Sequence, residues 1–166
     1  MARTQSFAAP NSLAGVNTQI DKIQRALGQC LLNTGALAIH GSASTVAKFV
    51  NTIYFNIDGT VYSKAAADTA ALSGTVVNAT FNVFTFTVNA AGTLHTYMGT
   101  AGAAINNVVF PATPDGEVMI GFVIINPTGT GNFVGGTTAL DDATVVPNAV
   151  YVNTPFSFHP DSLNPL

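Results

Sequence analysis

Short runs of β-branched and aromatic residues, separated by turn residues, fill the chain after residue 35 and restrict it to a β-rich fold. The stretch KFVNTIYFNIDGTVYSK, residues 48–64, has such runs on both sides of Asp58–Gly59. An Asp-Gly pair in this setting is a strong signal for a two-residue hairpin turn. The stretch therefore predicts a β-hairpin.

A second hairpin is predicted by TFNVFTFTVNAAGTLHTYMG, residues 80–99. Its centre, FTFTV, alternates large apolar residues with threonine, so Phe84, Phe86 and Val88 are expected on one face and the two threonines on the other. The NAAG sequence that follows supplies the residue types of a turn.

The stretch EVMIGFVII, residues 117–125, is apolar at both odd and even positions, which places it in the middle of the fold. Further short strands are expected at ALAIHG, GNFVGG and NAVYVN. The body, roughly residues 36–152, would then hold about six to eight short antiparallel strands. We expect a mainly β fold, either a β-sandwich or a partly closed barrel.

The N-terminal third has a different period. Apolar residues recur there at spacings of three and four, which is typical of one stripe of an amphipathic helix. The stripe consists of Leu13, Val16, Ile20, Ile23, Leu27 and Cys30. Two interpretations stay open: the helix lies on its own sheet, or its first five stripe residues form a short coiled-coil seam between copies of the chain.

Composition divides the chain into three expected parts. Residues 1–35 form an N-terminal arm and the amphipathic helix, with the arm ending near residue 12. Residues 36–152 form the β body. Residues 153–166, NTPFSFHPDSLNPL, contain three prolines and predict an extended tail. The first fifteen residues hold no continuous apolar stretch, so we expect no secretory signal peptide.

Charge is scarce and unevenly distributed. Charged residues make up 8% of the chain, against roughly 25% in typical domains. Residues 1–64 carry five positive and two negative side chains, whereas residues 65–166 carry six negative and no positive ones. This asymmetry is either chance in a charge-poor chain or a sign that a basic N-terminal part docks on a partner while an acidic body faces solvent. Five scattered cations do not predict nucleic-acid binding.

The residue types that carry chemistry do not form a known motif. His40, His95 and His159 lie in separate segments without a metal-ligand spacing, so each is expected at a surface or strand end. Cys30 lies on the apolar stripe and is expected to be an inert buried thiol. With no apolar run long enough to span a bilayer, no membrane segment is expected either.

Two acidic sites are expected to be solvated turns. Asp141–Asp142 is the densest acidic pair, and Asp115–Glu117 is a turn that leads into the strand after it. A calcium site would need several converging oxygen ligands, which neither sequence supplies alone. General acid–base catalysis needs paired titratable groups in a pocket. We therefore expect no cofactor, no metal and no enzymatic activity.

Two stretches resemble the virion structural proteins of tailed bacteriophages, the head-decoration or cement type. They are IYFNIDGTVYSKAAADTAAL and VVFPATPDGEVMIGFVII, the latter followed by GNFVGGTTALDDATV and YVN. Together they lie within residues 51–152. The shared features are strand and turn signatures rather than active-site signatures. The resemblance implies a non-enzymatic protein on the outer surface of the capsid that binds across neighbouring major capsid proteins and stabilises the head.

The resemblance also implies self-association, more often as a homotrimer than as a dimer. We expect Arg3, Phe7, Lys22 and Arg25 to face partners. The predicted oligomer seam is Leu13, Val16, Ile20, Ile23 and Leu27.

Two rival functions remain. One is a tail, fibre or head-fibre component that binds the host surface through loops near residues 126–136 and Asp141–Asp142. The chain has no tryptophan, which weighs against a sugar-stacking site. The other is an enzyme or inhibitor, which would need histidines and acids converging in one deep pocket.

Overall fold

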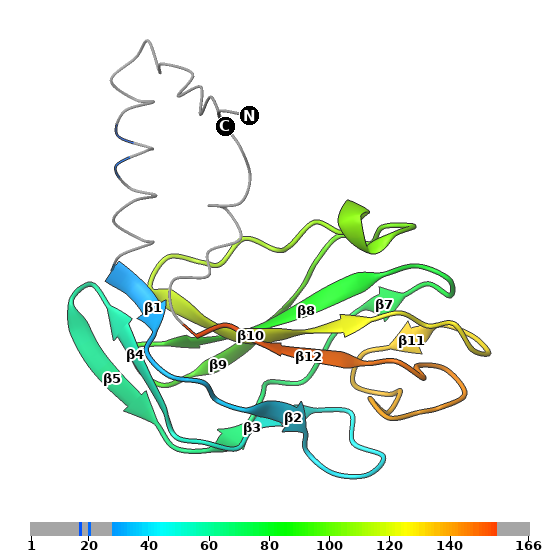
Figure 1. The fold of residues 1–166 in the computed structure, drawn as a ribbon, viewed down its shortest axis with the longest axis horizontal. Coiled ribbons are helices and arrows are strands. Elements are labelled where there is room, and N and C mark those ends of the chain that lie inside the picture. The colour runs from blue at the N-terminus through cyan, green and yellow to red at the C-terminus, as the bar shows by residue number, and fades with distance from the viewer. Residues whose placement is uncertain (1–16, 18–19, 21–27, 156–166) are drawn as a thin grey trace, which may run out of the picture.

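The computed structural model describes Asn17, Ile20 and residues 28–155 (Figure 1). The predicted arm, most of the predicted helix and most of the predicted tail lie outside the described residues. So do most of the residues predicted to contact partners or to form the seam: Arg3, Phe7, Leu13, Val16, Lys22, Ile23, Arg25 and Leu27.

The described residues form a mainly β structure of four antiparallel sheets, none of them closed into a barrel. The largest sheet has the order β12 (Val150–Asn153), β10 (Glu117–Ile125), β8 (Asn82–Asn89), β9 (Leu94–Met98). Two three-stranded sheets have the orders β1 (Gln29–Leu31), β4 (Ile53–Ile57), β5 (Thr60–Lys64) and β2 (Leu37–Ile39), β3 (Ala47–Phe49), β6 (Ala67–Asp68). The fourth pairs β7 (Thr75–Val76) with β11 (Phe133–Val134), and one short 3₁₀ helix spans Ile105–Asn107.

The first predicted hairpin is confirmed as β4 and β5, with Ile57 opposite Thr60. Both turn residues have positive φ, 51° at Asp58 and 83° at Gly59, as a turn of type I′ requires. The prediction is wrong at the start of the stretch, because Lys48 and Phe49 belong to β3, which pairs with β2 and β6 instead.

The second predicted hairpin is also confirmed, as β8 and β9. The predicted division of the faces of β8 is confirmed, with Phe84, Phe86 and Val88 in the larger core. Thr85 and Thr87, on the other face, are as deeply buried as the two phenylalanines. The threonine face is covered by a second, smaller apolar cluster. It consists of Val83, Met119 and Phe122, with Val108, Phe110, Ile124 and Val152 packed against it.

Strand β10 runs between β8 and β12, so its predicted central position is confirmed. Its pairing with β8 contains a β-bulge, because Met119 is opposite Thr87 and Gly121 is opposite Phe86, which leaves Ile120 as the extra residue. Before the bulge, the even-numbered Val118 faces the larger core. After the bulge, the odd-numbered Val123 and Ile125 face it. A bulge reverses the alternation of faces in this way.

The larger core lies between the four-stranded sheet and the smaller sheets (Figure 1). Its largest fully buried side chains include Phe49, Phe55, Phe84, Phe86 and Phe133, which come from four different strands. The number of strands in the body exceeds the prediction of about six to eight. The additional strands are two or three residues long, and each depends on a distant partner.

Strand β1 corrects the predicted helix, which was expected to extend through Cys30. Gln29, Cys30 and Leu31 instead pair with β4. Gln29 and Leu31 are buried, and Cys30 between them is only half-buried. Cys30 is therefore less buried than predicted, and the inertness of its thiol stays a prediction. Pairing with β4 overrides the helical spacing of this residue, as tertiary context often overrides local preference.

Candidate functional site

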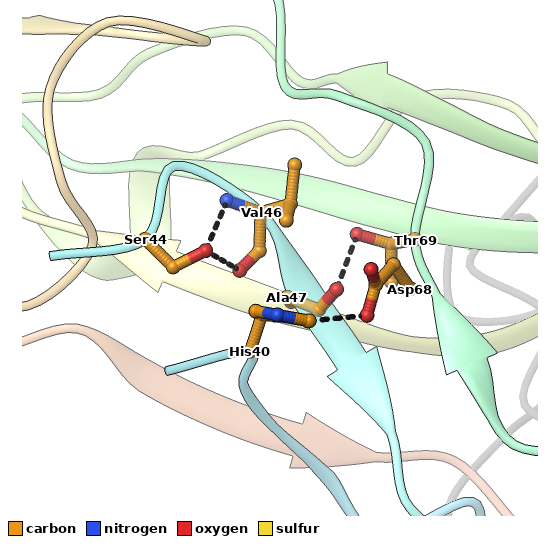
Figure 2. Close-up of polar contacts among 6 residues, drawn as sticks. All are labelled: His40, Ser44, Val46, Ala47, Asp68 and Thr69. Carbon is orange, nitrogen blue, oxygen red and sulfur yellow. Dashed lines mark hydrogen bonds and ion pairs between the residues drawn. The ribbon is translucent and has the colours of Figure 1, made fainter. Parts of the chain in front are cut away.

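A histidine and an aspartate meet on the exposed face of the β2–β3–β6 sheet (Figure 2). The Nδ1 atom of His40 lies 2.5 Å from Oδ1 of Asp68, and both side chains are about half exposed. Ser44 lies on the same segment as His40, but its hydroxyl group is engaged with the backbone of Val46. The histidine and aspartate therefore form an exposed surface pair, and this serine is not hydrogen-bonded to the imidazole.

A second polar cluster centres on Glu117, which is only 8% exposed. Its carboxylate accepts hydrogen bonds from the Thr87 hydroxyl at 2.5 Å and from the Tyr97 hydroxyl at 3.1 Å. The Nδ1 atom of His95 lies 2.8 Å from Oε1, close enough for an ion pair when the imidazole is protonated, although the two atoms are not aligned as a hydrogen bond. The predicted turn is confirmed, with φ of 74° at Gly116 and an exposed Asp115, but Glu117 is buried and not solvated.

This cluster holds its carboxylate in place rather than exposing it for chemistry. Burial raises the pKa of Tyr97, and the hydrogen bond to Glu117 adds to this effect. The Tyr97 hydroxyl therefore stays protonated and keeps donating to the carboxylate over the neutral range. The four side chains come from β8, β9 and the start of β10, so the cluster ties the three strands together at one end.

A third feature is a surface hollow of about 260 Å³. The residues that define it are Ile39, Leu140, Asp141, Val146, Pro147 and Tyr151. We call it the Tyr151 hollow. The hydroxyl group of Tyr151 is buried and has no hydrogen-bond partner among the described residues. Burial raises the pKa of Tyr151 to about 12, and the negative charge of Asp141 adds to this rise.

The acidic pair beside this hollow has two different roles. Both carboxylate oxygens of Asp141 accept from the backbone N–H of Ala43, at 3.1 and 3.0 Å. Asp142 accepts from the hydroxyl and the backbone N–H of Thr144, which lower its pKa. Asp141 is exposed, as expected of a solvated turn, whereas Asp142 is half-buried and closes the turn of its own loop.

All four predicted partner residues, Arg3, Phe7, Lys22 and Arg25, lie outside the described residues. Of the predicted seam, Ile20 is described; it is helical and 48% exposed. His40 and His95 lie next to a carboxylate each, which the sequence did not indicate because Asp68 and Glu117 are distant in the chain. Among the described residues no group of three or more His, Cys, Asp or Glu side chains is arranged to hold a metal ion.

No helix in the described part of the chain is long and apolar enough to cross a membrane. Comparison with known proteins adds no relative: no family model, no curated protein and no solved structure matches the chain.

Proposed function

We propose that the chain is a non-enzymatic decoration, or cement, protein of a tailed bacteriophage. In this proposal it lies on the outer surface of the capsid and binds across neighbouring major capsid proteins. Such a protein stabilises the mature shell because it binds the assembled form and not the separated subunits.

The observation that carries the proposal is an exposed and uncharged sheet face. On the outer side of the β1–β4–β5 sheet, Cys30, Asn56 and Val61 lie in one row of the register and Tyr54 and Ser63 in the next. None of them is charged. Val61 is 61% exposed and Tyr54 is 49% exposed. A neutral face with an exposed valine and tyrosine suits contact with a partner better than it suits solvent.

Charge distribution supports the same proposal. Residues 28–155 contain two cations, Lys48 and Lys64, and six acidic residues. The other three cations, Arg3, Lys22 and Arg25, precede residue 28. We propose that this basic N-terminal segment, together with Phe7, attaches the acidic body to the shell. The C-terminal tail is a second candidate for attachment.

The proposed assembly is a homo-oligomer, a trimer in preference to a dimer. The exposure of Ile20 supports a seam between copies, since an apolar stripe residue packed on its own sheet would be covered. We also infer that the sheets around the larger core form a β-sandwich, in which apolar side chains from facing sheets interdigitate.

Deleting residues 1–12 tests the mode of attachment. The truncated chain should lose co-sedimentation with capsids that lack the protein, because Arg3 and Phe7 are removed. Its thermal unfolding should match that of the full chain. The Gln5→Ala variant is the matched control and should bind normally. Undiminished binding by the truncated chain would show that the arm does not attach the protein.

A further inference from the structure

Strand β5 is an open edge of the described structure. It is the last strand of the β1–β4–β5 sheet, and in Figure 1 it lies on the outer side of β4 with no labelled strand beyond it. On the other side of β4, the N–H of Asp58 donates to the carbonyl oxygen of Gly28, and the N–H of Leu32 donates to that of Tyr54. The even-numbered residues of β4 therefore bond to β1, and the odd-numbered ones bond to β5.

This alternation leaves backbone groups of β5 without a partner. Thr60, Tyr62 and Lys64 lie opposite the odd-numbered residues of β4, so their N–H and C=O groups point toward β4. The N–H and C=O groups of Val61 and Ser63 consequently point outward. They form no backbone hydrogen bond within the described part of the chain, and both side chains are exposed. Such an edge can accept another strand.

The other edge strands of the described residues are less open. Proteins protect an edge with short strands, prolines, bulges, charges or a covering segment. β1, β2, β6, β7 and β11 are two or three residues long. β9 and β12 have neighbouring segments, since Thr96 donates to the carbonyl of Ala70 and Asn153 accepts from the N–H of Leu37. β5 is five residues long and has no proline and no bulge.

The charges of the β4–β5 hairpin favour a second copy as the partner strand. Residues 53–65 contain two charged side chains, Asp58 at the turn and Lys64 at the end of β5. Neither forms an ion pair among the described residues. Two β5 strands paired antiparallel about a twofold axis at Tyr62 would place each Lys64 beside the turn that carries Asp58 in the other copy. A parallel pairing would set like charges side by side instead.

We propose that β5 pairs antiparallel with β5 of a second copy. Val61 of each copy then exchanges backbone hydrogen bonds with Ser63 of the other, and the two three-stranded sheets become one continuous sheet. The inference goes beyond the proposed function, which assigns the outer face of this sheet to the shell and leaves its edge free. The pairing uses no residue of the proposed helix seam, so it would join copies from neighbouring oligomers. Its test uses purified protein without capsids, so its failure would leave capsid binding unaffected.

Cysteine cross-linking between two differently tagged full-length chains tests the register. Both chains carry Cys30→Ser. One carries Val61→Cys, and the other carries Ser63→Cys or, as the control, Tyr54→Cys on the same face one strand further from the edge. Opposite residues of a hydrogen-bonded antiparallel pair have Cα atoms about 5.5 Å apart, which a disulfide can span. With oxidised glutathione, Val61→Cys should link to Ser63→Cys and little to the control. Equal yields for the two pairings would overturn the proposal.

A proline at the edge tests the backbone hydrogen bonds. Ser63→Pro removes an outward N–H that has no partner within the described chain, and proline is tolerated at such edge positions. Because the pairing loses one hydrogen bond per copy, self-association measured by sedimentation velocity should weaken by roughly tenfold. Ser63→Ala retains the N–H and should associate like the wild type. Unchanged association in a Ser63→Pro chain that unfolds at the wild-type temperature would contradict the pairing.

Charge variants leave the backbone of the edge unchanged. Lys64→Glu places a negative charge beside Asp58 of the other copy and should weaken association by about two- to fivefold. Adding Asp58→Asn, which suits the positive φ of this turn position, should restore part of the loss. Asp141→Asn makes the same change of net charge in the loop between β11 and β12 and should restore none. Wild-type association in Lys64→Glu, or equal rescue by both asparagines, would refute the antiparallel register.

Discussion

Two tyrosines of the four-stranded sheet differ in what their hydroxyl groups contact. Tyr97 donates to the carboxylate of Glu117, so its hydroxyl is satisfied within the fold. Tyr151 is buried at its hydroxyl without a partner in the described part of the chain. An unpaired buried polar group costs about 1–3 kcal/mol.

The pKa of Tyr151 predicts a loss of stability in alkali. Because this pKa is about 12 in the folded protein and 10.0 for an unperturbed tyrosine, the unfolded chain loses its proton first as the pH rises. The contribution of Tyr151 to stability is therefore fully present below pH 10. Above that, stability falls by at most about 1.4 kcal/mol per pH unit, and by less where solvent screens the half-buried ring, until the folded group also ionises. In Tyr151→Phe this part of the loss should disappear.

Urea unfolding of dilute protein, at steps of about one pH unit between pH 9 and pH 12, would measure this loss of stability. The range brackets the pH values over which the proton binding of the folded and unfolded chains differs. Tyr54→Phe, which removes a hydroxyl from an exposed ring, is the matched control and should keep the wild-type loss. If Tyr151→Phe lost stability as steeply as the wild type, the burial of this hydroxyl would be refuted.

At the scale of elements, β10 is the strand on which the two cores depend. It presents apolar residues to the larger core on one face and to the smaller cluster on the other, and its bulge at Ile120 reverses which residues face each core. Gly121, directly after the bulge, allows close approach. A Cβ atom at this position would meet the carbonyl oxygen of Val152 and a methyl group of Leu37. The glycine is therefore required by packing, not by its backbone dihedral angles.

Replacing Gly121 with alanine should destabilise the fold by about 1–3 kcal/mol, since an added methyl group has no free space there. Chemical denaturation would show this as a lower midpoint. Gly41→Ala is the control, because nothing lies within 4 Å of a Cβ atom added at Gly41, and it should unfold like the wild type. A Gly121→Ala variant as stable as the control would mean that β12 and β2 do not approach β10 this closely.

The elements that the sequence predicted are those with their own local signals. The turn at Asp58–Gly59, the hairpin of β8 and β9 and the central strand β10 all have turn residues or long apolar runs. Strands such as β7 and β6 are two residues long and exist because of partners far away in the chain. Local patterns contain no information about such pairing.

The same reason explains why the sequence did not predict the two sites around Glu117 and Tyr151. Glu117 follows a turn signal, so its burial could not be predicted without knowing that Thr87, His95 and Tyr97 surround it. The Tyr151 hollow is built from β2, β12 and the loop between β11 and β12, and only the folded chain brings these segments together. The predicted partner residues of the N-terminal segment remain predictions.

At the scale of the whole molecule, the chain combines an acidic, charge-poor β body with a basic N-terminal segment. A neutral exterior gives little electrostatic protection against association, which suits a protein that works in a permanent assembly. The outer face of the β1–β4–β5 sheet offers one neutral contact surface. The proposed function assigns this surface to the shell.

Quantitative mass spectrometry of purified particles tests the proposed function most directly, because it counts copies of the chain against copies of the major capsid protein. A decoration protein should be present in numbers comparable with those of the major capsid protein. The Δ1–12 chain should be absent from the same particles. A handful of copies per particle would indicate a tail or fibre component, and no copies at all would contradict any role in the virion.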